Sequence, residues 1–340
     1  MRQGVFCTDA YIRAAASAVG KKEAEGPLGD LFDLRDADCR FGVKTWEGAE
    51  SEMQRMAMNV AMARAGVTDR DVDVLFAGDL LNQCVGSAYG LLGFDIPYIG
   101  LYGACSTCSE GLLLSALAVT GGSIRLCAAV TSSHYCAAER QYRTPIEYGG
   151  QRAPTAQWTV TGAGAFLVGR AEAGEEDLIR ISRVMIGKAV EKGICDANNM
   201  GAAMAPAAAD TLLRFFGETG ESPSDFDLIV TGDLGFEGGA ILEELMHAAG
   251  CPLSHYNDCG KMIFDRERQD VHSGGSGCGC SAVVLASHIL PMMHRGEWRR
   301  VLFLGTGAMM SPDSLKQGKS IPAVAHLVEL TRVKRGEAGA

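Results

Sequence analysis

The sequence contains no run of apolar residues long enough to cross a lipid bilayer. Its first residues, MRQGVFCTDAYIRAAASAVGKK, also lack the charged, apolar and small-residue regions that follow one another in a signal peptide. These two absences argue against a helical membrane protein and against secretion. We therefore expect a soluble protein on the cytoplasmic side of a membrane.

An excess of positive charge is missing as well. The chain has 31 lysines and arginines against 41 aspartates and glutamates, which gives a formal net charge of −10. A nucleic-acid partner requires a basic surface, so this class of partner is not expected. General electrostatic attraction to anionic lipid is not expected either.

Metal-binding spacings and disulfide-rich patterns are also absent. The 12 cysteines are spread among apolar neighbours in a chain of 340 residues, where free cysteine acts as a small hydrophobic residue. The pairs Cys105/Cys108 and Cys278/Cys280 open two apolar segments and lack the spacing of zinc or iron–sulfur ligands. The stretch GGSGCGCSA is not followed by the Lys-Ser/Thr of a phosphate loop. We expect few or no disulfides, no metal and no cofactor.

Two passages of the sequence resemble each other. DVDVLFAGDLL (71–81) and DFDLIVTGDLG (225–235) share an acidic lead-in, an apolar strand-like run and Gly-Asp-Leu. A Gly/Cys/Ser turn then opens an apolar helix in each half, GACSTCSEGLLLSAL in the first and GGSGCGCSAVVLASHIL in the second. Each unit ends in a strand led by arginine, over 125–133 and 299–311. This order predicts a duplicated βα unit.

The duplication predicts an α/β protein of five layers, αβαβα. Nearly continuous apolar strands that alternate with helices indicate sheets covered on both faces, and the two helices that are apolar all round should lie between the sheets. We place the halves at residues 1–174 and 175–340. Residues 206–227 are expected to form a helix with Pro206 at its start and a turn at Gly220.

A segment over 132–160 has no counterpart in the second half. It is rich in Arg, Tyr and Gly, and inserted segments of this kind on a rigid scaffold often build pocket walls or partner surfaces. We therefore expect this insert to form a pocket in the first half.

The Ala-Cys-Ser turn in a duplicated unit resembles the thiolase and ketoacyl synthase superfamily. More closely, EGPLGDLFD, AGDLLNQ, GACST, AERQYR, EYGGQ, TVTGAGA, MGAAMAPAAADT, NDCGKMI and GGSGCGCSAVV together resemble the stage V sporulation protein AD family, from about Gly26 to about His326. The resemblance implies a non-enzymatic, thiolase-like protein of spore-forming bacteria. Such a protein binds dipicolinic acid (pyridine-2,6-dicarboxylic acid) or its calcium chelate for uptake into the developing spore. It also implies a homodimer, membrane-embedded partners of the same transport complex, and a place beside the inner membrane of the forespore or spore.

Cys105 is the candidate nucleophile inherited from this superfamily. A thiol at the N-terminus of a helix has a lowered pKa, and nearby amides can hold an oxyanion. The enzymes add a pair of bases, and the GDLG turn where ketosynthases carry one histidine has none here. His272 is the remaining candidate base, and one base alone does not support the proton transfers of a condensation. We expect both residues to be vestigial. The alternative is a condensing or acyl-transfer enzyme that uses Cys105.

Recognition of dipicolinate, a planar dianion, requires guanidinium groups, hydroxyl or amide donors and a flat apolar wall. The amides of Cys105, Ser106 and Thr107 are candidates for one carboxylate. The insert supplies the other candidates, which are Ser132, Ser133, His134, Arg140, Arg143, Arg152 and Trp158, with Gln157 and Thr159 nearby.

Two alternatives stay open beside this ligand site. The arginines of the insert can also be ordinary surface or interface ion pairs. The protein can also be an assembly factor that docks to membrane subunits while its pocket is unused. HRGEWRR (294–300) is interpreted as a solvated turn, too short to anchor a membrane.

Overall fold

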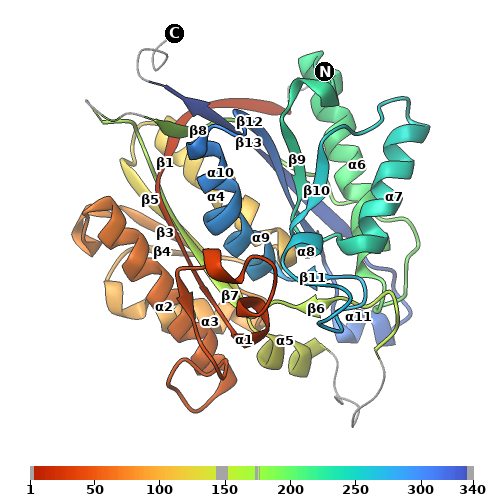
Figure 1. The fold of residues 1–340 in the computed structure, drawn as a ribbon, viewed down its shortest axis with the longest axis horizontal. Coiled ribbons are helices and arrows are strands. Elements are labelled where there is room, and N and C mark those ends of the chain that lie inside the picture. Colours follow the sequence, from red (N-terminus) through yellow and green to blue (C-terminus); the bar gives the residue numbers. More distant parts are fainter. Residues whose placement is uncertain (1–3, 143–151, 173–174, 176, 335–340) are drawn as a thin grey trace.

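The computed structural model describes residues 4–142, 152–172, 175 and 177–334. Its strands form one eleven-stranded sheet and a small two-stranded sheet (Figure 1). The first half contributes β1 (Val5–Val19), β2 (Leu34–Arg35), β3 (Val74–Gly78), β4 (Tyr98–Leu101), β5 (Leu126–Ser133) and β7 (Gly162–Gly169). The second half contributes β8 (Leu178–Met185), β9 (Leu228–Thr231), β10 (Tyr256–Asp258), β12 (Arg300–Ala308) and β13 (Ala323–Val333). The small sheet pairs β6 (Trp158–Thr159) with β11 (Gly275–Ser276).

The order of the strands repeats. From one edge to the centre the first half runs β4-β3-β5-β7-β1, and the second half runs β10-β9-β12-β13-β8 from the other edge. The three outer strands are parallel and the two inner pairings are antiparallel in both halves. β1 pairs antiparallel with β8 and joins the halves. The predicted internal duplication is therefore confirmed, whereas the short strands β4 and β10 were not foreseen.

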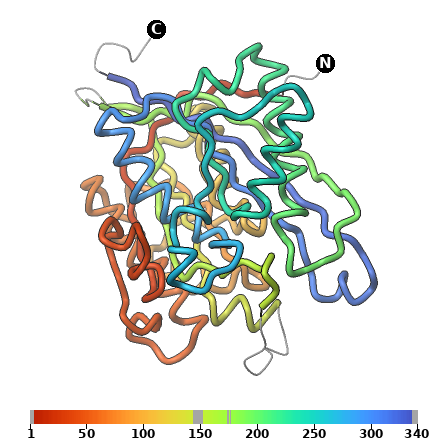
Figure 2. Tube along the Cα trace, turned by 45° about the vertical axis from the view of Figure 1, so that its right-hand side comes forward, coloured from red at the N-terminus to blue at the C-terminus, as the bar shows by residue number. Residues whose placement is uncertain are grey.

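The helices form three layers around these strands, as predicted. On the outer faces lie α2 (Trp46–Ala65) and α3 (Val85–Leu91) for the first half, and α6 (Met200–Thr219) and α7 (Gly235–Ala248) for the second. Between the strand layers lie α4 (Thr107–Thr120) and the run of α9 (Cys278–Val284), a π-helical turn (Leu285–Ile289) and α10 (Leu290–Arg295). Figure 2 shows the orange helices of the first half and the green-to-cyan helices of the second on opposite sides.

Three buried clusters of apolar side chains match these layers. The central cluster combines residues of α4 and α9 with Phe76, Phe166, Ile181 and Phe303 from strands of both halves. One outer cluster packs α2 on the first half, and the other packs α6 and α7 on the second. The central helices are therefore buried on all sides, which explains why their sequences are apolar all round.

Helix α6 starts earlier than expected. Within 206–227 the sequence predicted a helix that begins at Pro206 and is closed by a turn at Gly220, but the side chain of Asn199 accepts the amide of Ala202 at 3.2 Å and caps a helix from Met200. Pro206 lies inside it. The end was predicted correctly, because Gly220 closes the helix in a left-handed conformation with φ of +73°.

The connections between the last two strands of each half differ. Between β5 and β7 lie α5 (Tyr135–Tyr142) and β6, whereas between β12 and β13 lies α11 (Pro312–Lys316). The remaining short helices are α1 (Lys21–Ala24) and α8 (Cys259–Met262). Among the described helices, none has the length and apolar character needed to cross a membrane.

Candidate functional site

A tight turn before α4 positions Cys105. After β4 the chain forms a 3-10 turn over Ala104–Ser106, in which Ala104 has a left-handed φ of +51°. The Ser106 amide and hydroxyl both donate to the Gly103 carbonyl, at 3.1 and 2.6 Å. The Thr107 amide and hydroxyl donate to the Ala104 carbonyl. The donors of Ser106 and Thr107 that were expected to hold a carboxylate are thus used within the turn.

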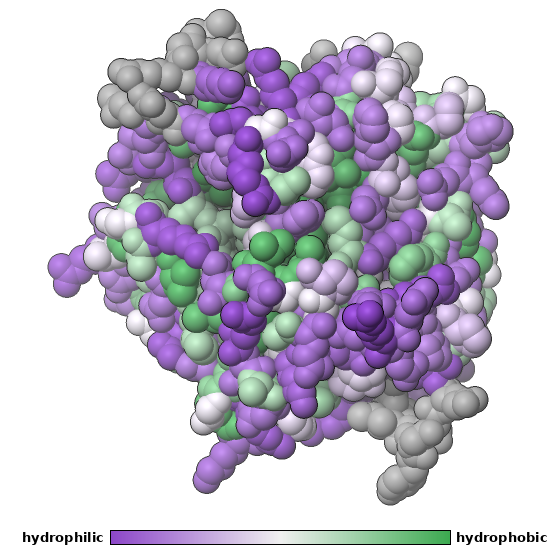
Figure 3. Space-filling view, viewed as in Figure 1, coloured by the Kyte–Doolittle hydropathy of each residue, from purple (hydrophilic) through white to green (hydrophobic). Residues whose placement is uncertain are grey.

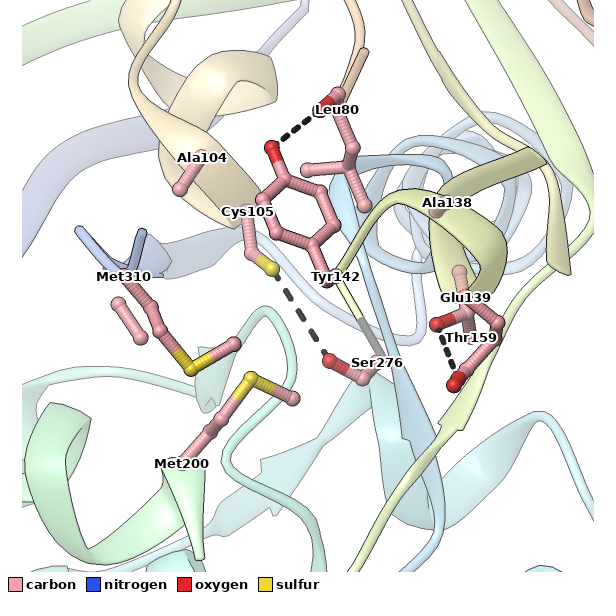
Figure 4. A pocket seen from close by; sticks show the side chains of 11 residues that line it. Leu80, Ala104, Cys105, Ala138, Glu139, Tyr142, Thr159, Met200, Ser276 and Met310 are labelled. Carbon is pink, nitrogen blue, oxygen red and sulfur yellow. Dashed lines mark hydrogen bonds between the residues drawn. The ribbon is translucent and has the colours of Figure 1, made fainter. Parts of the chain in front are cut away.

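Cys105 lines a small cavity between the halves (Figure 4). The cavity has a volume of about 60 Å³. The Cys105 sulfur lies 3.9 Å from the Ser276 hydroxyl. The Tyr142 hydroxyl donates to the Leu80 carbonyl, and the Thr159 hydroxyl donates to Glu139 at 2.9 Å. The lining comprises Leu80, Ala104, Cys105, Ala138, Glu139, Tyr142, Thr159, Met200, Ser276, Ala308 and Met310.

The surroundings of Cys105 disfavour a thiolate. Burial raises the pKa of the Cys105 thiol well above its usual value, and the carboxylate of Asp233 raises it further. Reactive cysteines instead sit beside a cation or an imidazolium that stabilises the thiolate. Cys105 is therefore a protonated, buried thiol at neutral pH.

Asp233 is the functional residue that sequence reasoning missed. It is fully buried and accepts hydrogen bonds from the Ser276 hydroxyl, the Gly277 amide and the Thr306 hydroxyl at 3.0, 2.8 and 2.8 Å. Burial raises the pKa of Asp233, and these hydrogen bonds oppose the rise. The sequence signal for this residue is the Gly-Asp-Leu pattern that both halves share.

A larger hollow opens beside the cavity, with a volume of about 640 Å³. Ala104, Tyr142 and Met310 line both spaces, so these residues separate the hollow from Cys105. The other lining residues of this outer hollow are Asn82, Tyr102, Gln141, Met309, Ser311, Pro312, Asp313 and Lys316. They come from the 3-10 turn between β3 and α3 (Asn82), from the segment after β4 (Tyr102), from α5, and from the connection that contains α11.

The outer hollow carries donor groups. The Gln141 side-chain nitrogen is buried and has no hydrogen-bond partner among the described residues, while its oxygen accepts the Asn82 amide at 3.1 Å. The Tyr102 hydroxyl lies 3.1 Å from both the Asn82 side-chain oxygen and the Tyr142 hydroxyl. Lys316 adds a positive charge.

The three polar residues predicted at the end of β5 are buried elsewhere. Ser132 donates to Glu50 at 2.9 Å, and Ser133 donates to the Val160 carbonyl at 2.6 Å. His134 shares a hydrogen bond of 2.9 Å with the Cys39 carbonyl. None of these three residues lines the cavity or the outer hollow.

Arg140, Arg152 and Trp158 also lie outside both spaces. Arg140 forms an ion pair with Glu47. The Arg152 guanidinium lies 4.7 Å from the centre of the Trp158 ring, which also stacks on Tyr135 at 3.9 Å and has the Lys22 ammonium 3.9 Å from its centre. Arg143 falls outside the described residues. Of the neighbouring residues named from sequence, Gln157 donates to the Asp233 carbonyl at 2.6 Å and Thr159 lines the cavity.

His272, the candidate base, is not at the cavity. Its Nδ1 lies 2.8 Å from the Ala153 carbonyl, and its Nε2 lies 2.9 Å from Asp270. No histidine belongs to the described lining of the cavity. Within the described ranges, no group of three or more His, Cys, Asp or Glu side chains is arranged to hold a metal.

Comparisons with known proteins agree on one family and one fold. The model of the stage V sporulation protein AD family matches residues 2–331. Stage V sporulation protein AD of Bacillus subtilis (strain 168) is 41% identical over 329 residues, which cover 96% of each chain.

Solved structures resemble the chain at the level of the fold. A variant of OleA from Xanthomonas campestris has a TM-score of 0.61 and 13% identity, covering 97% of this chain and 99% of that one. The 3-oxoacyl-(acyl-carrier-protein) synthase III of Aquifex aeolicus has a TM-score of 0.55 and 11% identity, covering 95% and 99%. The thiolase-like fold predicted from the sequence is therefore confirmed.

Proposed function

The chain belongs to the stage V sporulation protein AD family, and from this premise we propose that it is a non-catalytic, thiolase-like sporulation protein that binds dipicolinic acid. The ligand enters as the free acid or as its calcium chelate, and the protein serves its uptake into the developing spore. Membrane-embedded proteins of the same transport complex are the proposed partners, which puts the protein on the cytoplasmic face of the forespore or spore inner membrane.

The environment of Cys105 is the main observation that supports the proposed loss of catalysis. A condensing enzyme must hold its thiolate near a base, but here burial and the carboxylate of Asp233 both raise the thiol pKa. The histidine expected to act as base, His272, is held by Ala153 and Asp270 away from the cavity. The proton transfers of a condensation therefore lack both of their usual groups.

The outer hollow fits the ligand better than the cavity at Cys105. The cavity of about 60 Å³ is roughly a tenth as large as the outer hollow of about 640 Å³, so the hollow leaves the ligand more room. The outer hollow of about 640 Å³ accommodates a pyridine ring against Tyr142 and Met310. Lys316 and the unpaired side-chain amide of Gln141 supply a charge and a donor for the carboxylates. Asp313, on the same wall, offers an oxygen to calcium in the chelate.

The test is a titration of dipicolinic acid, with and without calcium, into the wild type and two single variants. We expect one-to-one binding whose affinity falls about tenfold or more in Lys316→Gln, because a hydrogen bond to a charged group contributes about 1.5–3 kcal/mol. Gln141→Leu, which removes the unpaired amide, should weaken binding as well. Lys319→Gln removes a neighbouring exposed lysine outside the hollow and should leave binding unchanged. A flat trace from folded wild type would exclude dipicolinate as the ligand.

A condensing or acyl-transfer enzyme is the alternative, and one observation favours it. Cys105 still lies at the first turn before a buried helix and lines a cavity, which is where an acyl enzyme would carry its nucleophile. Such an enzyme becomes acylated on Cys105 when it is incubated with an acyl thioester. Mass spectrometry of the intact protein detects the added acyl group, and its absence supports the binding protein.

We further propose a homodimer formed through the edge strand β4. Tyr98 and Ile99 on this strand are 40% and 48% exposed, and Tyr89 and Leu92 beside it are 71% and 74% exposed. An exposed apolar edge strand can pair with the same strand of a second copy across a two-fold axis. Ile99→Lys should give a monomer in light scattering, whereas Ile186→Lys, at another exposed isoleucine, should not. A dimer that persists in Ile99→Lys would exclude this interface.

A further inference from the structure

A second hollow lies where β12 begins and β13 ends. It has a volume of about 200 Å³ and is lined by Gly296, Trp298, Arg299, Arg332 and Lys334. Three of these residues are cationic, and none of the described lining residues is acidic. The chain has a net charge of −10, so these three residues form a local cluster of positive charge on a negatively charged protein. We call it the basic hollow. Figure 1 shows α10 and the end of β13 in the upper part of the view, left of its centre.

Arg332 is fixed in the basic hollow by Asp177. Its Nε donates to the Asp177 carboxylate, which also lies 3.5 Å from Nδ1 of His294. Pairing with Arg332 lowers the pKa of Asp177, and the same pair raises the pKa of Arg332. The guanidinium is thus held through one edge, which fixes where its other nitrogens can reach.

Gly296 leaves room for this guanidinium. The residue ends α10 in a left-handed conformation with φ of +86°. A Cβ at this position would lie 2.5 Å from Nη1 of Arg332, closer than two such atoms can approach. A side chain here would displace the guanidinium, so the glycine keeps Arg332 at the wall of the hollow.

Trp298 supplies an apolar wall. Its ring meets the ring of His288 edge-on, with the centres 5.8 Å apart and an angle of 84° between the planes. Burial lowers the pKa of His288, and Arg295 lowers it further, so this histidine is neutral at physiological pH. The indole is therefore packed against a neutral ring, while the three cations surround the space beside it.

We propose that the basic hollow binds a phosphate group. Phosphate offers several anionic oxygens, which match guanidinium forks and an ammonium better than a single carboxylate does. The chemistry is shared by the headgroup of an anionic phospholipid and by soluble phosphate. Hydrophilic residues dominate the face seen in Figure 3, and hydrophobic residues form small patches between them, so a lipid would be bound through its headgroup rather than by insertion. The proposal is independent of the dipicolinate site.

The basic hollow also changes the interpretation of residues 294–300. The sequence predicted a solvated turn, too short to anchor a membrane, and a chain without attraction to anionic lipid. The structure brings the end of β13 to this turn and adds Arg332 and Lys334 to Arg299. A charge cluster formed by two distant segments cannot be seen in either segment alone.

The lipid arm of the test uses vesicles of phosphatidylcholine with and without phosphatidylglycerol, at low salt. We expect the wild type to co-sediment only with the anionic vesicles. The double variant Arg299→Gln/Lys334→Gln should bind them about tenfold or more weakly, because each cation near an anionic surface contributes. The double variant Lys21→Gln/Arg268→Gln removes the same charge from exposed positions near α1 and should bind like the wild type.

The soluble arm uses equilibrium dialysis against inorganic phosphate alone. Phosphate retained by the wild type and lost in Arg299→Gln/Lys334→Gln supports the site with a soluble source. Binding to anionic vesicles without retention of phosphate assigns the site to a lipid headgroup. The proposal is overturned if the wild type binds neither probe, or if the Lys21→Gln/Arg268→Gln variant loses binding to the same extent.

Discussion

Each half of the molecule has two equivalent aspartates, Asp73 and Asp79 in the first half and Asp227 and Asp233 in the second. The first aspartate of each half makes the same kind of contact, whereas the second does not. Asp73 accepts the amides of Arg125 and Leu126 at 2.7 and 3.2 Å, and thereby fixes the start of β5 beside β3. Asp227 does the same for the start of β12, accepting the amides of Arg299 and Arg300 at 2.7 and 2.9 Å. Both belong to the acidic lead-in that the sequence repeats.

The next aspartate in each repeat has diverged. Asp79 accepts the Ser87 amide and hydroxyl at 2.7 and 2.6 Å and so serves its own half. Asp233 instead binds Ser276 and raises the thiol pKa of Cys105, a residue of the other half. The duplication therefore retained the contacts that align strands, and it changed the contacts at the interface between halves, where the cavity lies.

The largest expected difference between the halves concerns ion pairs on the sheet. In the second half, buried Glu329 pairs with both Arg183 and Arg300, which also lie over Phe215 and Phe226. Glu329→Ala removes one of the two carboxylates that bind these arginines, while Glu221 remains, and should lower the free energy of unfolding by about 3 kcal/mol. In the first half, Arg125 is 83% exposed in its pair with Asp73, and Arg125→Ala should cost less than about 0.5 kcal/mol. Chemical denaturation measures both, and equal losses would contradict the comparison.

The buried helices provide the second test. A Cβ on Gly279 of α9 would lie 2.3 Å from the Gly162 carbonyl, a backbone atom that cannot move aside. Gly279→Ala should therefore destabilise the protein by about 3 kcal/mol. A Cβ on Gly111 of α4 meets Ala129 at 3.3 Å, so Gly111→Ala should change stability by less than about 1 kcal/mol, because alanine favours the helix. Thermal unfolding followed by circular dichroism distinguishes the two, and a stable Gly279→Ala would show that α9 can shift.

The third test uses pH and compares one buried group of each half whose pKa is shifted, Glu23 in the first and His326 in the second. Burial raises the pKa of Glu23 to about 7, so the folded protein holds a proton that the unfolded chain releases. Its contribution to stability is present below about pH 4.5 and is lost as the pH rises through 7. Glu23→Gln removes this pH-dependent loss of stability. The free energy of unfolding of Glu23→Gln minus that of the wild type should therefore rise by about 2.5 kcal/mol between pH 5 and pH 8.

His326 in the second half gives the opposite sign. Burial lowers its pKa to about 4, so stability is lost as the pH falls from 6.5 towards 4. His326→Gln should therefore help only on the acidic side, where Glu23→Gln has little effect. Denaturant midpoints measured across this range test both signs, and a difference between Glu23→Gln and wild type that stays constant with pH would contradict the assignment.

Sequence reasoning recovered the scaffold and only part of the site. The repeated strands, the buried helices and Cys105 at a tight turn carry local signals, namely apolar runs, Gly-Asp-Leu and Ala-Cys-Ser. The walls of the outer hollow combine residues of quoted motifs, such as Asn82 and Tyr142, with Met309–Lys316, a segment that carries no such signal. Ser132, Ser133 and His134 were predicted as ligand residues for their chemistry, whereas the end of β5 points them into buried hydrogen bonds. Residue type alone cannot distinguish a side chain that binds a ligand from one that forms a buried hydrogen bond.

The smallest expected effect addresses the diverged aspartates directly. Asp233→Asn removes a negative charge beside Cys105 and should lower the pKa of its thiol, which raises the rate of alkylation by iodoacetamide. Burial remains the first cause of the raised pKa, so labelling stays slow in absolute terms. Asp79→Asn removes a buried charge from the matching turn and should leave Cys105 unchanged. Peptide mass spectrometry quantifies the label on each cysteine of folded protein. Rapid labelling of Cys105 in the wild type at neutral pH would instead support the enzyme, because only a stabilised thiolate reacts that fast.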